Sequence, residues 1–568
     1  MLQGIRFMSN SMFYTGLSGL NAAQAALVTT GHNTANVNTP GYSRQTAQIS
    51  ASGGSNVPGV GFFGNGAKVT DVSRSYDQYL SSQLNQAQSL NQSLTTYGTQ
   101  ISQIDNLLAS QTAGLAPQMQ TLFTNVQAVV NTPADTSARQ QLISSGQALA
   151  NQFRSMDQFL AGLNASVNDQ VSGTVDQINT YAQEIASLNK QVARFGNASG
   201  TQAPNDLLDQ RDQLVSDLGK LVGTKVVVQD GGQFNVFIGN GQTLVLGGKA
   251  TMLAAVSSAS DASRTTLATV NNAGKAVQMQ EGLITGGSLS GLLQFRAETL
   301  SNAQNSLGRI AISLADSFNT QQKAGFDLNG VKGKEFFSQA SPAVLPNATN
   351  SKTVPVGVLT AGFADIGKLT TSDYRVEATG TGTGTGTGNF KVTRLSDNAT
   401  VAADSTGAYD GLTLNFAGGA TGDSFLIQPT RAGARDFSVV LIDPAEVAAA
   451  SSPFTNLPDS PSGVSDGRNA LLLGALQNKK TMAGGSASFN DAYAQLVSTV
   501  GNKARQVQIS NTAQSSLTLQ IRTAQQSVSG VNQDEETANL LMFQQMYQAN
   551  AKVIQTASTM FDAVLGIR

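Results

Sequence analysis

The chain has 568 residues, which at roughly 100 to 200 residues per domain predicts about three to five domains. Only 12% of the residues are charged, about half of the usual ~25%, and roughly 36% are Ser, Thr, Asn or Gln. A net charge of -2, one histidine and no cysteine argue against phosphate-driven nucleic-acid binding, an anionic membrane surface, disulfides and thiolate chemistry.

The N-terminal residues do not resemble an export leader. Residues 1–8 carry one arginine and no apolar core of 7 to 15 residues, so we expect no cleavable secretory signal. Translation can start at Met1 or at Met8, and the sequence leaves both open. No apolar run approaches the ~18 residues of a membrane span, so we expect no membrane association.

Two long helical seams follow in chain order. Apolar residues recur at steps of three and four from Leu80 to Leu108, and again from Leu142 to Val192 with one slip after Val167. Fifty residues of helix span ~75 Å, which predicts a rod rather than a globule. After Pro204, residues 205–214 predict an acidic amphipathic helix.

Strand and turn patterns occupy the middle of the chain. Residues 226–228 and 234–238 predict strands, with hairpin turns at Asp230–Gly231 and Asn240–Gly241. Helical spacing returns from Leu292 to Leu314. Further strands are predicted at 374–376, 390–392, 412–416 and 424–427, interrupted by a Thr–Gly repeat at 380–388 that predicts a flexible loop. The fold class is therefore mainly α with inserted β domains.

The last helical block runs from about residue 489 to the end, with a break near 529–531. Asn532 and Glu535 predict an N-cap and capping box, and three carboxylates at 534–536 favour the helix start. These carboxylates could instead bind a cation, but they lack spaced partner ligands. Two adjacent apolar seams follow, one from Leu540 to Val564 and one from Met542 to Ile567, which predict several neighbours for one helix. An ordinary core helix is the alternative; the low charge of the chain favours repeated subunit packing.

Both ends of the chain resemble the flagellar rod, hook and hook-associated proteins. The motifs are Ser18–Leu27 and His32–Gln45 at the N-terminal end, and Ser529–Glu536, Ala538–Leu541 and Gln544–Ile554 at the C-terminal end. The second set is most similar to the hook-associated branch of this family, which joins hook to filament. Interior segments at 205–214, 236–242, 291–296 and 325–330 agree, and 340–450 matches least.

The resemblance implies a non-enzymatic axial subunit with no cofactor. The N- and C-terminal helices would pair in the inner layer of a hollow tube, and middle domains would project outward. Its partners would be copies of itself, the hook protein below, other hook-associated or junction proteins above, and an export chaperone. Export unfolded through a flagellar channel would place it outside the cell, at the hook–filament junction.

The implied assembly interface and domain division can be stated by residue. The expected domains are 8–60 with 529–568 (terminal assembly helices), 61–221 with 285–339 and 451–528 (helical rod), 222–284 (small β insertion) and 340–450 (outer β domain). The expected interface comprises Leu17, Leu20, Leu27, Asn36, Asn38, Thr39, Pro40, Gly41, Tyr42, Leu540, Phe543, Tyr547, Ile554, Phe561 and Val564.

Several motifs invite other functions. Pro40–Gly41 predicts a turn, and the first helix is expected to end before it at about residue 37. The main body of this helix is expected at about Met12 to Gly31. His32 lies beside this turn, where we expect no acidic neighbour, and it is expected to pack or cap, not to catalyse. The Gly239–Gly241 motif fails the dinucleotide pattern, and the Thr–Gly repeat lacks the ending of a P-loop.

Competing functions remain open at this point. Another hook or rod protein is the nearest. A chemoreceptor-type signalling coiled coil would need membrane spans and charged helix faces. An extracellular adhesin or hydrolase on a helical stalk would need a convergent site in the β domains.

Overall fold

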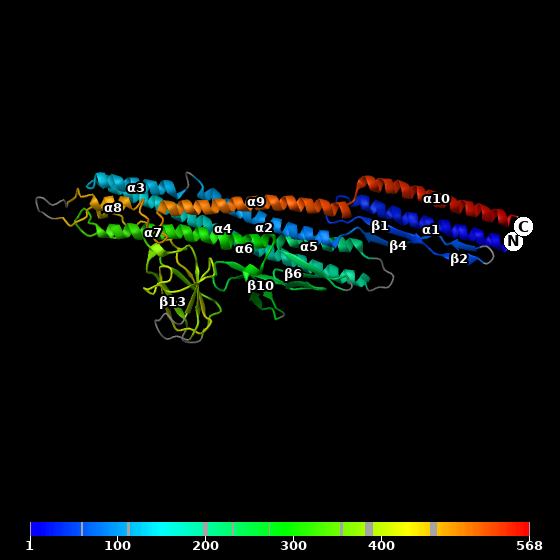
Figure 1. Ribbon diagram of the computed structural model, residues 1–568, viewed down its shortest axis with the longest axis horizontal. Helices are drawn as coiled ribbons and strands as arrows, with labels where there is room; N and C mark the ends of the chain where they lie inside the picture. The colour runs from blue at the N-terminus through cyan, green and yellow to red at the C-terminus, as the bar shows by residue number, and fades with distance from the viewer. Residues whose placement is uncertain are drawn as a thin grey trace.

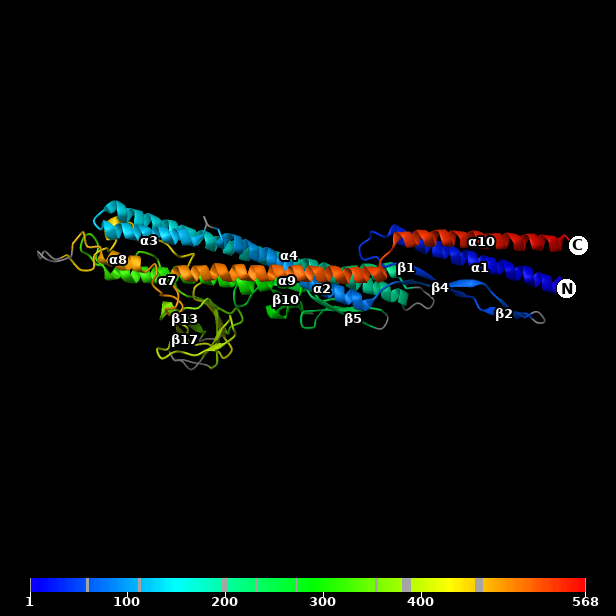
Figure 2. The same ribbon diagram turned by 45° about the horizontal axis from the view of Figure 1, so that its top comes forward.

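The computed structural model describes an elongated molecule in which long helices form a rod and two β regions lie on one side of it (Figure 1). Both ends of the chain lie together at one tip of the rod (Figure 2). The structure describes residues 2–57, 61–110, 114–196, 203–229, 232–271, 273–352, 356–380, 390–454 and 463–566. The predicted fold class is confirmed.

Helices make up most of the described chain. The α-helices are α1 (Leu2–Ala35), α2 (Gln78–Leu108), α3 (Leu115–Asn131), α4 (Thr136–Gly196), α5 (Asn205–Leu221), α6 (Gly287–Gln294), α7 (Ser301–Ala324), α8 (Arg468–Ala475), α9 (Phe489–Ser529) and α10 (Gln533–Leu565). Short turns are η1 (Glu281–Leu283), η2 (Phe295–Leu300), η3 (Ile366–Lys368) and η4 (Pro444–Glu446), of which η2 is π-helical.

The rod core follows the predicted helical seams. In α4, which has 61 residues, the seam from Leu142 to Val192 is buried at nearly every step. In α2 the pattern holds only in the second half, because Leu90 is 48% exposed and Gln88, Ser89 and Ser93 are buried instead. Helix α9 packs along both halves of α2, since Gln514 donates to Ala87 O at 3.1 Å and Tyr493 OH donates to Leu108 O at 3.0 Å. The buried Gln88 accepts from Ser216 Oγ of α5 at 3.0 Å.

The segment after α1 is a β ribbon that sequence patterning missed. Strands β1 (Gln45–Ala51) and β4 (Ala67–Arg74) pair antiparallel, and β2 (Gly54–Val57) with β3 (Gly61–Gly64) extends the hairpin. Most side chains of β1 and β4 are half-buried or exposed, so they lack the apolar alternation that marks a strand in sequence. Helices α3 and α8 were also not predicted.

The small β region consists of two antiparallel sheets against the rod. One has the order β5 (Thr224–Val228), β6 (Phe234–Ile238), β7 (Gln242–Leu246), β8 (Lys249–Ala250), and the other is β11 (Ala276–Gln278), β10 (Thr265–Val270), β9 (Leu253–Ser257). The predicted turn at Asn240–Gly241 joins β6 to β7, where Gly241 has φ +101°. The predicted turn at Asp230–Gly231 lies outside the described residues.

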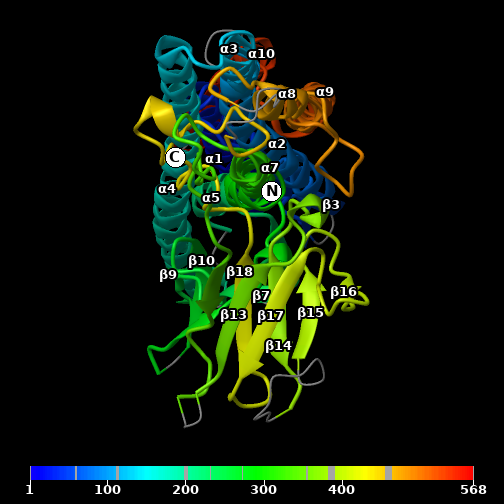
Figure 3. The ribbon, with the colours of Figure 1, turned by 90° about the vertical axis from the view of Figure 1, so that its left-hand side faces the viewer.

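The outer β region has a five-stranded antiparallel sheet with its own core (Figure 3). The order is β12 (Ala343–Pro346), β18 (Ser424–Gln428), β14 (Tyr374–Ala378), β15 (Phe390–Arg394), β16 (Thr400–Val401), and β13 (Val358–Phe363) pairs with β17 (Leu412–Ala417). All four predicted strands are present. The Thr–Gly repeat lies outside the described residues, apart from Gly380.

Candidate assembly interface

Helices α1 and α10 pack side by side at the tip of the rod, joining the two ends of the sequence (Figure 1). Helix α10 begins as predicted, because the Asn532 side chain accepts from Asp534 N at 3.0 Å. The capping box is only half present: the Glu535 carboxylate accepts from Arg44 at 2.9 Å instead. Helix α1 is longer than predicted and runs from Leu2 to Ala35.

Two glycines of α1 let the helices approach closely. A Cβ on Gly16 would lie 2.8 Å from Ile554 Cγ1 and 3.3 Å from Val553 Cγ1. A Cβ on Gly19 would collide with the Asn550 amide. Since a contact under 3.0 Å forces a neighbour to move, small residues at these two positions set the spacing of the pair.

The predicted interface residues divide between two faces. Phe543 and Ile554 of α10, and Leu20 and Leu27 of α1, are half-buried within the subunit. Exposed positions form the second group: Leu17 at 37%, Leu540 at 38%, Tyr547 at 37% and Phe561 at 46%. The side chain of Val564 lies outside the described residues. The seam of α10 therefore only partly covers α1, and part of it faces outward.

The exposed surface of the pair is rich in large apolar side chains and poor in charge. Its exposed large side chains are Met12, Phe13, Tyr14, Leu17 and Val28 on α1, and Leu540, Leu541, Met542, Met546, Tyr547, Met560 and Phe561 on α10. Between residues 537 and 563 the sequence has one cation, Lys552, and one anion, Asp562. Between Arg6 and Arg44 the only titratable group besides tyrosines is His32. We call these twelve exposed side chains the apolar tip face.

The 36–42 loop closes α1 with a turn, as predicted. Tyr42 N donates to Thr39 O at 3.2 Å, and Gly41 at the third position has φ +79°, the geometry of a type II turn. Asn38, Thr39, Pro40 and Gly41 are exposed, and Asn36 is half-buried with its Nδ2 donating to His32 O at 3.0 Å. The loop belongs to the foot of the terminal pair, not to its apolar tip face.

A buried asparagine ties that loop to both terminal helices. Asn33, 1% exposed, accepts at Oδ1 from Tyr42 OH at 2.7 Å and from Gln45 N at 2.9 Å. Its Nδ2 donates to Gln45 O at 2.8 Å and to Glu536 Oε2 at 3.2 Å. Burial, followed by the charges of Asp206 and Asp209, raises the pKa of Tyr42, which keeps the phenol protonated as a donor.

Ion pairs continue this connection into the rod. Arg44 pairs with the buried Glu536 at 2.8 Å, and Arg74 of β4 reaches Asp209 at 2.8 Å and Asp212 at 2.6 Å on α5. Burial raises the pKa of both α5 carboxyls, and the guanidinium of Arg74 acts in the opposite direction by stabilising their ionised forms. We call the polar contacts around Asn33, Arg44 and Arg74 the foot network.

The single histidine lies in this network and not in a catalytic arrangement. His32 Nδ1 is 3.0 Å from Tyr42 OH, and Nε2 is 3.7 Å from Asp206 Oδ2. The expectation that it lacks an acidic neighbour was wrong, because α5 brings Asp206 from 174 positions away in the chain. Its partners are structural polar groups of the loop and α5.

Within the described residues, the structure contains neither a metal-binding cluster nor a membrane-spanning helix. No group of three or more His, Cys, Asp or Glu side chains in the described part of the chain could hold a metal ion. Within the same ranges, no helix is both long and apolar enough to traverse a bilayer. The carboxylates of Glu535 and Glu536 both pair with Arg44, at 2.9 and 2.8 Å, and that of Asp534 lies with them in the first turn of α10.

Comparison with known families places the fold and the terminal pair in a flagellar context. The model "Flagella basal body rod protein" matches residues 13–42, and "Flagellar basal body rod FlgEFG protein C-terminal" matches 524–567. These are the segments that form α1 with its loop and α10. Both ends of the chain thus carry segments characteristic of flagellar rod proteins.

Comparisons over the whole chain identify the family. "Flagellar hook-associated protein FlgK helical domain" matches residues 101–337, and "Flagellar hook-associated protein 1, D2-like domain" matches 345–429. Flagellar hook-associated protein 1 of Escherichia coli is 43% identical over 98% of this chain and 100% of its own length. That of Salmonella typhimurium is 45% identical over the same shares. The chain belongs to the flagellar hook-associated protein 1 (FlgK) family.

A solved structure agrees with this assignment. The flagellar hook junction protein FlgK from Burkholderia pseudomallei is 31% identical, with a TM-score of 0.71, covering 79% of this chain and 100% of that one. This protein is accordingly a structural component of the flagellum that acts among other flagellar proteins.

Proposed function

We propose that this chain assembles with copies of itself into a ring at the hook–filament junction and adapts the hook to the filament. The observation that carries the proposal is the apolar tip face: twelve large side chains exposed on two paired helices with almost no charge. Large apolar side chains exposed in this number on two paired helices mark an interaction site. The Burkholderia pseudomallei relative is a flagellar hook junction protein, which supports the location.

The chemistry of this face fits a second copy of the same chain. Burying amides, hydroxyls and apolar groups avoids the desolvation cost of burying charges. Met542, Met546 and Met560 are flexible and can adapt to slightly different neighbours around a ring. The hook protein below and other hook-associated proteins above would contact the two ends of such a ring.

The proposed division of labour follows the domains. Segments 8–60 and 529–568 would form the inner tube layer, with the predicted interface residues as its contacts. The rod (61–221, 285–339, 451–528) would carry the small β insertion (222–284) and the outer domain (340–450) on the outside. The chain would have no enzymatic activity, would leave the cell through the flagellar export channel with a chaperone, and would act extracellularly.

A deletion strain tests the location. Cells lacking the protein should build hooks and secrete filament subunits into the medium but should not retain filaments, and plasmid-borne wild-type chain should restore retention. Electron microscopy of the cell bodies and immunoblots of the medium measure both outcomes. Absence of hooks would place the protein in the hook or rod, the nearest alternative. Normal filaments would favour a stalked adhesin.

A further inference from the structure

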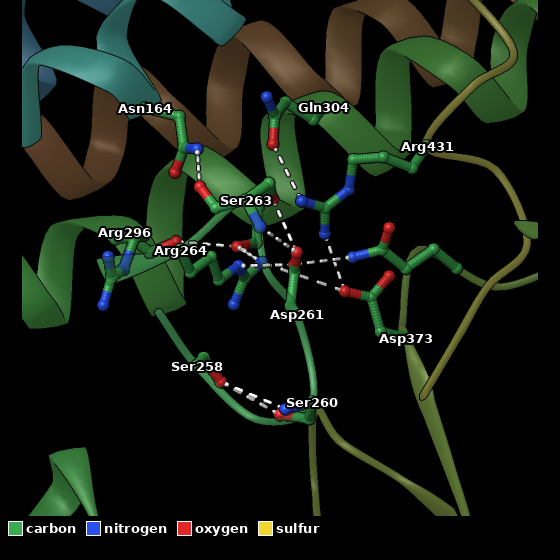
Figure 4. A network of polar contacts seen from close by, with 12 residues as sticks. Asn164, Ser258, Ser260, Asp261, Ser263, Arg264, Arg296, Gln304, Asp373 and Arg431 are labelled. Carbon is green, nitrogen blue, oxygen red and sulfur yellow. Dashed lines mark hydrogen bonds and ion pairs between the residues drawn. The ribbon is translucent and has the colours of Figure 1, made fainter. Parts of the chain in front are cut away.

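A buried polar network joins the outer β region, the small β region and the rod at one place (Figure 4). It contains Arg264, Arg296 and Arg431 together with Asp261, Glu281 and Asp373, so three cations balance three anions. It lies far in sequence from the foot network, and nothing in the junction role proposed above requires it.

The outer region enters this network through two residues. Arg431 lies just after β18, and Asp373 lies just before β14. The Arg431 guanidinium donates to Asp373 Oδ2 at 2.6 Å. The same guanidinium donates to Asn305 Oδ1 at 2.9 Å and Gln304 Oε1 at 3.0 Å on α7. Asn305 returns a bond from Nδ2 to Asp373 Oδ1 at 2.8 Å. One arginine–aspartate pair is thereby fixed to a rod helix.

The small β region enters from the other side, through the loop between β9 and β10. Asp261, 4% exposed, pairs with Arg264 at 3.1 Å and accepts from Gln428 Nε2 of β18 at 3.1 Å. Arg264 donates to Ser301 Oγ of α7 at 2.8 Å. The loop also receives a bond from α4, since Asn168 Nδ2 donates to Ser263 O at 2.9 Å.

Apolar packing does much less to fix the outer region to the rod. Its core cluster is separate from that of the rod and includes a single rod residue, Ile312 of α7. Backbone bonds run from Gly484 N to Gly367 O at 2.7 Å and, to the small β region, from Ala348 N to Ala259 O at 2.8 Å. From α7, Arg309 donates to Leu369 O at 3.3 Å and Asn305 Nδ2 to Thr371 O at 3.1 Å, and the chain after Arg431 enters the rod core at Ala434 and Phe437. Because apolar contacts are non-directional and charged hydrogen bonds are directional, the network is the element that can define an angle.

We propose that this network is a three-way clamp that holds the outer and small β regions in one fixed orientation on the rod, so that they project as a rigid unit. The outer region would stay folded on its own core if the clamp were broken, but it would then swing about its two connections to the rod. In an assembled ring, a fixed angle would give the outer regions of neighbouring copies a uniform spacing.

Two clamp variants and a matched control test this in the full-length chain. The clamp variants are Arg431→Gln in the outer region and Asp261→Asn outside it. The control is Arg394→Gln, which breaks the Arg394–Asp410 pair (2.6 Å) wholly inside the outer region. Because the chain has no cysteine, spin labels attach only at introduced ones, for example at the exposed Ala165 of α4 and Lys391 of β15. Pulsed dipolar spectroscopy then gives the distribution of distances between the two labels.

The parent and the control should give one narrow distribution, and each clamp variant should broaden it at least about twofold while hydrogen exchange in β14 and β18 stays slow. If Arg431→Gln unfolds the outer region, Asp261→Asn decides, since it changes no residue of that region. A narrow distribution in Asp261→Asn, or equal broadening in the control, would overturn the clamp.

Discussion

Replacing Phe561 by alanine should weaken assembly without affecting the isolated subunit. Phe561 lies on α10 near the end of the chain and keeps 46% of its surface exposed. About half of its surface is thus already covered within the subunit, and the other half remains free for a neighbour. If the apolar tip face is an inter-subunit surface, the exposed part of the ring becomes buried only when copies assemble.

The exposed fraction sets the size of the effect. An aromatic side chain presents about 200 Å², so roughly 90 Å² of Phe561 remains to be buried by a neighbour. At about 25 cal/mol per Å², this is about 2 kcal/mol per subunit, or roughly a 30-fold weaker contact. The 3–5 kcal/mol typical of a fully buried phenylalanine is too large here, because half of the ring is already covered.

The assay compares filament retention with export. Cells producing Phe561→Ala should carry fewer and shorter filaments after mild shear, while immunoblots of the medium show wild-type export of the variant. Phe159→Ala is the matched control, because Phe159 is 39% exposed but lies on α4 in the rod. Wild-type retention in Phe561→Ala, or an equal defect in Phe159→Ala, would refute the inference that the tip face assembles.

Four further outcomes are expected. Amides of α1 and α10 should exchange rapidly in isolated monomer and become protected on assembly, because one helix pair cannot cover the apolar tip face; strong protection in the monomer would contradict this. Replacing residues 343–428 by a short Gly–Ser linker should leave export and attachment intact, since Ala343 pairs with Gln428; exported but unattached protein would show that the outer region carries part of the joint. Gly16→Ala should weaken the assembled pair by about 1–3 kcal/mol through overpacking and lower the temperature at which filaments detach, whereas Gly31→Ala, with no atom within 4 Å of its Cβ, should not; equal behaviour would argue against tight pairing. Asn33→Ala removes four hydrogen bonds, so it should lower the stability of the terminal pair by about 2–4 kcal/mol and reduce the retention of filaments. Asn38→Ala, at an exposed position, should retain filaments as the wild type does. Wild-type filament retention in the Asn33→Ala strain would show that the foot network is dispensable.

Sequence patterning predicted those elements in which a regular spacing of apolar residues matches the positions buried in the structure. Helix α4 is the clearest case, because its seam repeats for about fifty residues and each apolar step lies in the rod core. The outer strands were found because buried and more exposed residues alternate in β14, while β18 contains a short continuous apolar run. The prediction for the first half of α2 was wrong in detail, because Leu90 is exposed and polar residues are buried in its place.

The candidate interface was only partly predictable, for a different reason. The two seams of α10 indicated a wide contact surface, but the sequence could not say which part α1 covers. That depends on the close approach at Gly16 and Gly19, a property of three-dimensional packing. The foot network was missed altogether: Asn33, Arg74 and Asp209 are brought together from 176 positions of chain, and no local pattern marks polar groups that meet in this way.

The few charged residues of the chain are distributed unevenly between two kinds of contact surface. Where the geometry must be fixed, at the foot of the terminal pair and at the clamp, the few charges are paired and buried: Arg44 with Glu536, and Arg431 with Asp373. Where neighbours must be accepted, on the tip face, charges are almost missing and methionines and aromatics take their place. Ion pairs are directional and lose stability if one partner shifts, whereas apolar contacts tolerate small displacements. The junction role proposed above requires both properties, and the sequence provides them in separate segments.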